Sequence, residues 1–122
     1  MFKLKVTSSF SSAHFLRHYR GKCENLHGHN WKVEAVIVSD VLDKCGMVID
    51  FGDLKKYLKD ILEGLDHKNI NEIDYFKTAN PSSEEIARYI FNELKKRITL
   101  AGAKLEGVRV YETDTSCATY CE

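Results

Sequence analysis

Two stretches of the chain alternate apolar and polar residues with the period of two that a half-buried β-strand requires. In residues 2–14 the even positions carry the apolar side chains, and in residues 27–38 the odd positions carry most of them. The opposite positions hold mainly charged, hydroxyl or amide side chains. We therefore expect two long strands that each bury one face, which restricts the fold to a sheet covered on one side.

Histidines stand at one end of the apolar face of both predicted strands. His14 is the last even position of the first strand, and His27 and His29 begin the apolar face of the second. Because side chains two apart on a strand share a face, all three imidazoles are predicted to point inward. Three neutral imidazoles are the ligand set of a catalytic zinc site with one open position. In the competing interpretation His14 is a hydrogen-bonded core residue and the other two lie on an exposed strand.

Three further groups carry reactive chemistry. Cys23 lies one short loop before His27, where it is either a metal ligand, a reactive thiol or a small buried hydrophobe. Asp66 directly precedes His67, and such a carboxylate can orient an imidazole, although adjacent Asp-His pairs are also common in exposed loops. Glu112 falls on the apolar face of a C-terminal strand, where it either has a partner or reaches solvent at an edge.

Two amphipathic helices are predicted from apolar residues that recur at spacings of three and four. The first covers residues 53–64. The second starts at Pro81, where Ser82 and Glu85 have the spacing of a capping box, and runs to about Leu100.

The remaining segments complete an α+β domain over residues 1–122. Residues 47–51 are expected to be a short extended run and residues 65–80 a long connection. Residues 105–113 and 117–122 are β-prone and should form a hairpin. The predicted order is β-β-α-α-β-β, with a four-stranded antiparallel sheet and two helices on one face.

The composition is that of an ordinary globular protein. The 18 basic and 18 acidic residues give no net charge, which argues against a nucleic-acid or membrane-surface partner. The first six residues lack the apolar core of a signal peptide, so we expect a cytoplasmic protein with four reduced cysteines. A Cys117–Cys121 disulfide along one strand is not expected, because residues four apart on a strand are separated by about 13 Å.

Six motifs stand in order along the chain: Ala13-His14, Cys-x-x-x-His-Gly-His from Cys23, Ile49-Asp50-Phe51, Leu65-Asp66-His67, Asn80-Pro81-Ser82-Ser83-Glu84 and Val110-Tyr111-Glu112-Thr113. Taken together, they resemble the 6-pyruvoyl-tetrahydropterin synthase family over essentially the whole chain. The spacing from Cys23 to His27 and the segment Cys117-Ala118-Thr119-Tyr120 are most similar to its branch of 6-carboxy-5,6,7,8-tetrahydropterin synthases of queuosine (7-deazaguanine) biosynthesis. Ser82 and Cys121 replace a Thr and a Gly that are frequent in the family.

The resemblance implies a tunnelling fold (T-fold), in which subunits join edge to edge into an oligomeric barrel. Two trimers then stack as a homohexamer, and the active sites lie between subunits. Closure of a barrel would also cover the edge strands of each sheet. The implied site residues are the Zn²⁺ ligands His14, His27 and His29, the general base Cys23, the proton relay of His67 with Asp66, and the pterin-binding Glu112.

The reaction implied by the resemblance is a zinc-dependent carbon–carbon lysis. Its substrate would be 7,8-dihydroneopterin triphosphate, and its products 6-carboxy-5,6,7,8-tetrahydropterin, acetaldehyde and triphosphate. One alternative is 6-pyruvoyl-tetrahydropterin synthase activity, which eliminates triphosphate without carbon–carbon cleavage. Another is a non-catalytic zinc-binding oligomer. A local basic cluster, which could contact the triphosphate, comprises Arg17, His18, Arg20 and Lys22.

Overall fold

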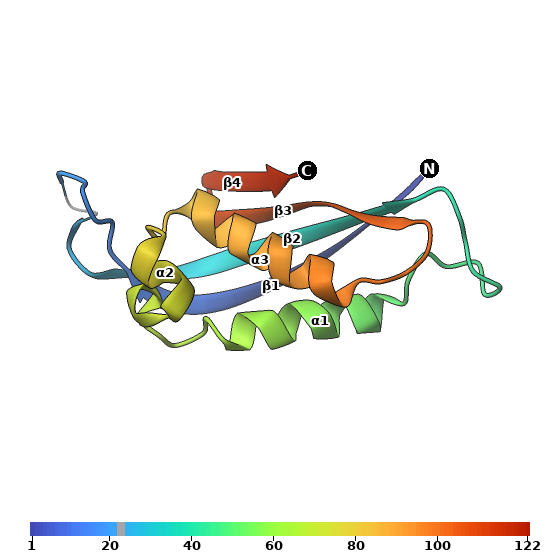
Figure 1. The fold of residues 1–122 in the computed structure, drawn as a ribbon, viewed down its shortest axis with the longest axis horizontal. Helices are drawn as coiled ribbons and strands as arrows, with labels where there is room; N and C mark the ends of the chain where they lie inside the picture. The colour runs from blue at the N-terminus through green and yellow to red at the C-terminus, as the bar shows by residue number, and fades with distance from the viewer. Residues whose placement is uncertain (22–23) are drawn as a thin grey trace.

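An antiparallel sheet of four strands, in the spatial order β1-β2-β3-β4, runs the length of the molecule (Figure 1). The computed structural model describes residues 1–21 and 24–122. The predicted strands and their antiparallel arrangement are confirmed. Their bounds are β1 Phe2–His14, β2 His27–Ser39, β3 Ala103–Thr113 and β4 Ser116–Cys121.

Two long helices cover one face of this sheet, as predicted. Helix α1 (Phe51–Glu63) packs against β1, and helix α3 (Ser83–Arg97) packs against β3, β4 and α1 (Figure 1). Ser82 caps α3 by accepting a hydrogen bond from the Glu85 backbone N–H at 3.2 Å. The Glu85 carboxylate does not complete the capping box, since it accepts hydrogen bonds from the Tyr75 hydroxyl and from Arg88.

The segments between the strands and helices differ from the prediction in two places. The run expected to be extended over residues 47–51 bends at Val48 and Ile49 and ends at Asp50. Asp50 caps a helix that begins at Phe51 and accepts a hydrogen bond from the Gly52 N–H at 2.6 Å. The connection after α1 contains a 3₁₀ helix, η2 (Ile70–Glu72), and a short helix, α2 (Asp74–Thr78). Both are too short to show a helical period in the sequence.

The core lies between the sheet and the helices. The even residues of β1 and the odd residues of β2 face it. Burial increases along β1 toward His14, whereas on β2 His27 and His29 are half-buried and the odd residues from Trp31 onward are buried. Phe10 stacks on the fully buried Trp31 with ring centroids 5.8 Å apart, and His14 beyond them is 1% exposed. The histidines therefore continue the packed core. Within the described residues, none of the helices combines the length and hydrophobicity needed to cross a bilayer.

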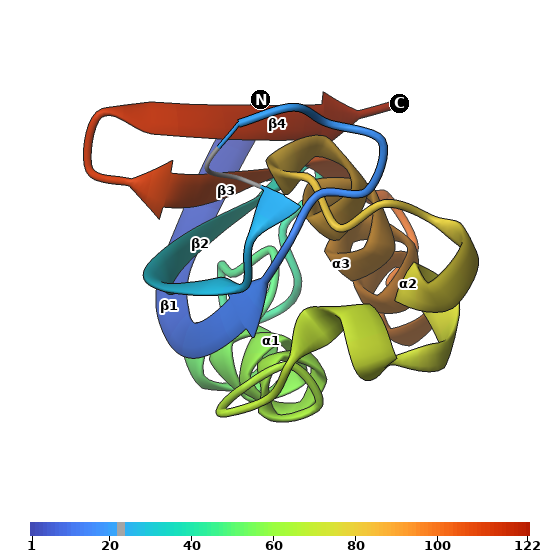
Figure 2. The ribbon, with the colours of Figure 1, turned by 90° about the vertical axis from the view of Figure 1, so that its left-hand side faces the viewer.

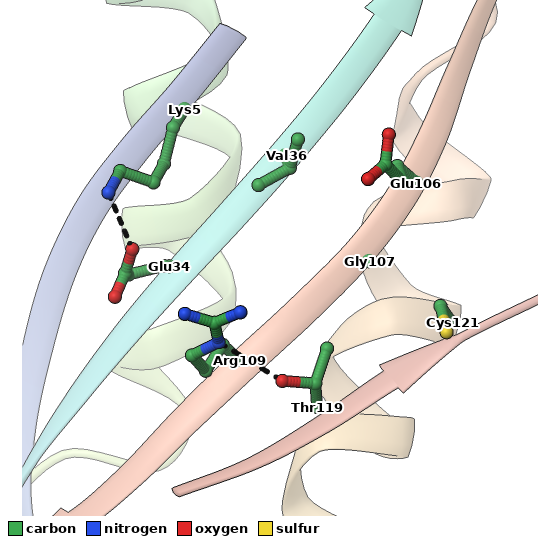
Figure 3. A pocket seen from close by; sticks show the side chains of 8 residues that line it. All are labelled: Lys5, Glu34, Val36, Glu106, Gly107, Arg109, Thr119 and Cys121. Carbon is green, nitrogen blue, oxygen red and sulfur yellow. Dashed lines mark hydrogen bonds and ion pairs between the residues drawn. The ribbon is translucent and has the colours of Figure 1, made fainter. Parts of the chain in front are cut away.

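The opposite face of the sheet carries charged side chains around a shallow pocket (Figure 3). Glu34 points to this face, as predicted, yet it is 6% exposed because side chains of the adjacent strands surround it. Lys5 on β1 lies 2.9 Å from its carboxylate, and Arg109 is its cross-strand neighbour on β3. The hydrogen bond from Lys5 is the main cause of the lowered pKa of Glu34.

The lowered pKa of Glu34 predicts how this network depends on pH. Its folded pKa lies below the ordinary value of 4.5, so the stabilisation is present above that pH and is lost as the pH falls through the folded pKa. We expect Glu34→Gln to lower the free energy of unfolding by about 1 kcal/mol at neutral pH, because Lys5 is largely exposed and the pair is screened. Urea denaturation at neutral pH and near pH 3 should show this difference shrinking in acid.

The matched control for this measurement is Glu106→Gln on the same face. Glu106 pairs with Lys3 at 3.0 Å, but both side chains are well exposed, so the expected loss is below about 0.5 kcal/mol. A loss at Glu34 that stayed constant from neutral to acidic pH would show that the carboxylate charge is not what stabilises the sheet.

Candidate metal centre and active site

The sheet register brings the three predicted imidazoles together at one end of β1 and β2. His14 is the direct cross-strand partner of His27, and His29 follows two residues later on the same face. The ring centroids lie 4.6 to 5.3 Å apart. Trp31 forms the base of this group, with its ring 4.9 Å from that of His14 and 5.2 Å from that of His29. Strand geometry and core packing thus fix the positions of the imidazoles.

Hydrogen bonds to backbone carbonyls set the tautomers of two of these histidines. The Nδ1 atom of His14 lies 2.7 Å from the Pro81 carbonyl oxygen, and that of His27 lies 2.7 Å from the Asn25 carbonyl oxygen. A carbonyl oxygen can only accept, so each Nδ1 carries the proton and each neutral ring has an unprotonated Nε2. Such backbone acceptors are a usual support for metal-binding histidines.

The two unprotonated Nε2 atoms face each other at 3.1 Å. Two lone pairs at this distance repel each other unless a cation lies against both. A proton is a poor cation for this purpose, because burial lowers the pKa of His14 below its usual value. A divalent metal ion fits the donors better.

The carboxylate of Glu112 on β3 completes the group. Its Oε1 atom lies 2.9 Å from Nε2 of His29, 3.4 Å from Nε2 of His14 and 4.0 Å from Nε2 of His27. Four ligands around a tetrahedral Zn²⁺ at 2.0–2.1 Å are about 3.3 Å from one another, so these spacings suit one ion. Glu112 could therefore act as a fourth ligand, at the position that the sequence analysis left open.

The environment of His29 also favours a metal. Its Nε2 atom is buried and makes no hydrogen bond within the part of the chain that the structure describes, although the Glu112 oxygen is close. An unpaired buried nitrogen is costly, and a metal ion would satisfy it. Burial lowers the pKa of His29 as well, which keeps the ring in the neutral form that binds metals.

Asp66 and His67 form a separate pair that the structure attaches to the edge of β1. The Asp66 carboxylate lies 2.9 Å from His67 Nδ1 and accepts a hydrogen bond from the Ser11 N–H at 2.8 Å. The Ser11 hydrogen bond, followed by the contact with His67, lowers the pKa of Asp66. The His67 side chain is 82% exposed, and the pair is not part of the histidine group. The predicted Asp-His pair is therefore formed, but it faces solvent in the single chain.

Two of the sequence predictions near the site have different outcomes. Cys23, the predicted general base, and Lys22 lie outside the described residues. Arg17 belongs to the basic cluster that could contact the triphosphate, and its guanidinium donates to the Phe76 carbonyl at 2.7 Å and to the Asn71 carbonyl at 3.4 Å. Arg17 is thus engaged by the backbone of its own chain. The supporting contacts from Pro81 and Asn71 were not predicted.

The fold and the site together define an α+β protein with a group of three histidines and one glutamate that could bind a metal ion at one end of a four-stranded sheet. The family model for 6-pyruvoyl tetrahydropterin synthase matches residues 3–122. The chain is 36% identical to the 6-carboxy-5,6,7,8-tetrahydropterin synthase of Haemophilus influenzae over the whole of both chains. It is 41% identical to a protein of the same name from Synechocystis, over 92% of this chain and 87% of that one.

The structural comparison agrees. The fold matches that of the Caenorhabditis elegans 6-pyruvoyl tetrahydropterin synthase with a TM-score of 0.89 and 31% identity, covering 99% of this chain and 95% of that one. The chain belongs to the 6-pyruvoyl tetrahydropterin synthase family, a family of enzymes, and has its T-fold subunit architecture.

The geometry predicts that each histidine is required for metal binding. We expect His27→Ala to weaken metal affinity by more than about 100-fold, since it removes a ligand and not just a supporting contact. Metal analysis of the purified protein and competition with a chromophoric chelator measure this. His18→Asn is the control, because His18 is exposed and has a positive φ of 62° that asparagine tolerates. Unchanged metal content in His27→Ala would contradict the proposed centre.

Proposed function

We propose that the protein is a zinc-dependent lyase that converts 7,8-dihydroneopterin triphosphate to 6-carboxy-5,6,7,8-tetrahydropterin, acetaldehyde and triphosphate, in 7-deazaguanine (queuosine) biosynthesis. The observation that carries this proposal is the group of three imidazoles, two of them with their Nδ1 protons bound to backbone carbonyls and their Nε2 atoms free, in a chain similar along its length to proteins named for this activity. The reaction consumes one water. Electrons lost by the side chain are gained by the ring, so no external reductant is required.

Four residues would form the metal-binding part of the site. A Zn²⁺ ion held by His14, His27 and His29 would supply Lewis acidity toward the side-chain hydroxyls of the substrate. The Glu112 carboxylate is 30% exposed, so substrate can reach it. In our proposal it accepts hydrogen bonds from the pterin N–H edge and so orients the substrate beside the metal-binding imidazoles.

Proton transfer is assigned to Cys23 and to the Asp66–His67 pair. Cys23 is proposed as the general base, because three neutral imidazoles around a divalent ion leave a positive charge that favours a nearby thiolate. Asp66 holds the proton of His67 on Nδ1, so Nε2 is available to exchange a proton with the substrate. The exposure of His67 supports a site that a neighbouring subunit completes.

We also propose that the subunits associate as the family resemblance implies. β1 and β4 are the two edges of the sheet, and their pairing between copies would close a barrel of three subunits. Two such rings would form a hexamer. The cytoplasm is the proposed location, where the exposed thiols of Cys45, Cys117 and Cys121 would stay reduced.

Product analysis separates this function from its nearest alternative. With 7,8-dihydroneopterin triphosphate as substrate, we expect acetaldehyde, triphosphate and a carboxypterin in equal amounts. The name of the Caenorhabditis elegans structure favours the alternative, in which triphosphate is released and a 6-pyruvoyl product accumulates. Detection of that product without acetaldehyde would replace the first assignment by the second.

Substitution of the proton-transfer groups tests whether the centre is catalytic at all. We expect Cys23→Ala and His67→Asn to keep metal and oligomer but to lower turnover by about 10²- to 10⁴-fold. Asparagine suits position 67, because its backbone φ of 54° is in the left-handed region. Steady-state kinetics beside metal analysis check this. Full turnover in both variants would show that neither Cys23 nor His67 transfers the protons of the reaction. Zinc binding without any turnover by the unmodified protein would indicate a non-catalytic zinc-binding oligomer.

A further inference from the structure

The last residues of β1 and those that follow it are hydrogen-bonded to a segment that is distant in the sequence. Residues 65–81, which connect α1 to α3, contact residues 11–17 almost one by one. Figure 2 looks onto this end of the molecule, with α2 and the start of α3 beside the strand ends. The contacts join Ser11 to Asp66 and His67, Ser12 to Leu65, Ala13 to Lys68, His14 to Pro81, Phe15 to Asn71, and Arg17 to Asn80.

Two asparagine side chains in this segment imitate a neighbouring strand. The Asn71 amide accepts from the Phe15 N–H at 2.9 Å and donates to the Phe15 carbonyl at 3.0 Å. The Asn80 amide accepts from the Arg17 N–H at 2.8 Å and donates to the Arg17 carbonyl at 3.0 Å. Each side chain therefore satisfies both backbone groups of one residue just beyond the metal-centre histidine.

Asn80 also lies next to the residue that orients His14. The Pro81 carbonyl accepts the Nδ1–H of His14, and Asn80 holds the backbone of Arg17 three residues further along. The Arg17 guanidinium also donates a hydrogen bond to the Phe76 carbonyl at 2.7 Å, which further fixes Arg17 to the segment of residues 65–81. If the Asn80 contact is lost, Asn71 still holds Phe15, but the direct connection between the Arg17 backbone and the residue next to Pro81 is removed. The carbonyl that orients the His14 ring is then less tightly fixed to the segment that follows His14.

We propose that Asn80 is a positioning residue of the metal centre: it fixes the Pro81 carbonyl against the segment after His14 and so sets the direction of the His14 Nε2 atom. The proposal rests on the metal-binding part of the proposed function and is independent of the reaction product. Supporting residues of this kind typically change metal affinity by 10- to 100-fold when they are removed. Asn71 supports the same segment, but its deeper burial makes it a worse site for substitution.

The test compares three variants of the full-length protein loaded with Co²⁺. Asn80→Ala removes both hydrogen bonds, and we expect it to weaken Co²⁺ binding by about 10- to 100-fold. Asn80→Asp keeps the acceptor for the Arg17 N–H but loses the donor to the Arg17 carbonyl, so its effect should be smaller. Asn92→Ala, on helix α3 and away from the centre, should bind Co²⁺ like the unmodified protein.

Two readouts separate positioning from a general loss of stability. Chelator competition gives the Co²⁺ affinity of the folded protein, and the visible absorption of bound Co²⁺ reports its coordination geometry. A graded loss of affinity, with a shifted spectrum in Asn80→Ala, supports the proposal. Unchanged Co²⁺ affinity and an unchanged spectrum in folded Asn80→Ala would overturn the proposal, even if the variant has a lower Tm. If that variant does not fold, Asn80→Asp is decisive by the same criteria.

The unmodified protein serves as a separate check on the centre itself. If it binds no Co²⁺, the metal-binding part of the proposed function fails. If it binds Co²⁺ and the Asn80 variants have the same Co²⁺ affinity and spectrum, the metal-binding part stands and only the positioning role of Asn80 is wrong.

Discussion

The cross-strand pairing of His14 with His27 is the interaction on which the site depends. It follows from a continuous β1–β2 register that starts with Phe2 opposite Ser39. A slip by one residue would turn all the strand side chains to the opposite face, so the register has to be strongly specified. The buried aromatic stack of Phe10 and Trp31 specifies it, because a shifted pairing would expose both rings. The packing that stabilises the sheet therefore also aligns the metal donors.

The same arrangement places an electrostatic cost at the end of the core. Backbone acceptors fix the protons of His14 and His27 on Nδ1, which leaves two lone pairs 3.1 Å apart in a site that disfavours a charged imidazole. A bound metal ion would turn this repulsion into attraction, so metal binding would stabilise the folded chain. The network around Glu34 on the other face is paired within the protein and carries no such cost.

The sequence was sufficient to predict features set by local backbone geometry. Strand alternation gave the common face of the imidazoles, and the Ser82 cap gave the start of α3. The supporting contacts of the site could not be predicted, because Asn71 and Asn80 bind backbone groups 56 and 63 residues away and leave no periodic signal. The backbone contacts of Arg17 were not predicted for a related reason: a basic loop residue suggests an anionic ligand, and its carbonyl partners at Phe76 and Asn71 are more than 50 residues away.

The segment that supports His14 also limits where another subunit can pair with β1. Asp66 and His67 occupy the outward N–H and carbonyl of Ser11, and the Ala13 N–H donates to the Lys68 carbonyl, so the strand edge is closed from Ser11 onward. The free edge is residues 2–10, which is long enough for the six residues of β4 (Ser116–Cys121). In the proposed barrel, a neighbouring strand would therefore have to stop beside His67. The exposed imidazole would then lie next to the neighbouring subunit, where a shared active site requires it.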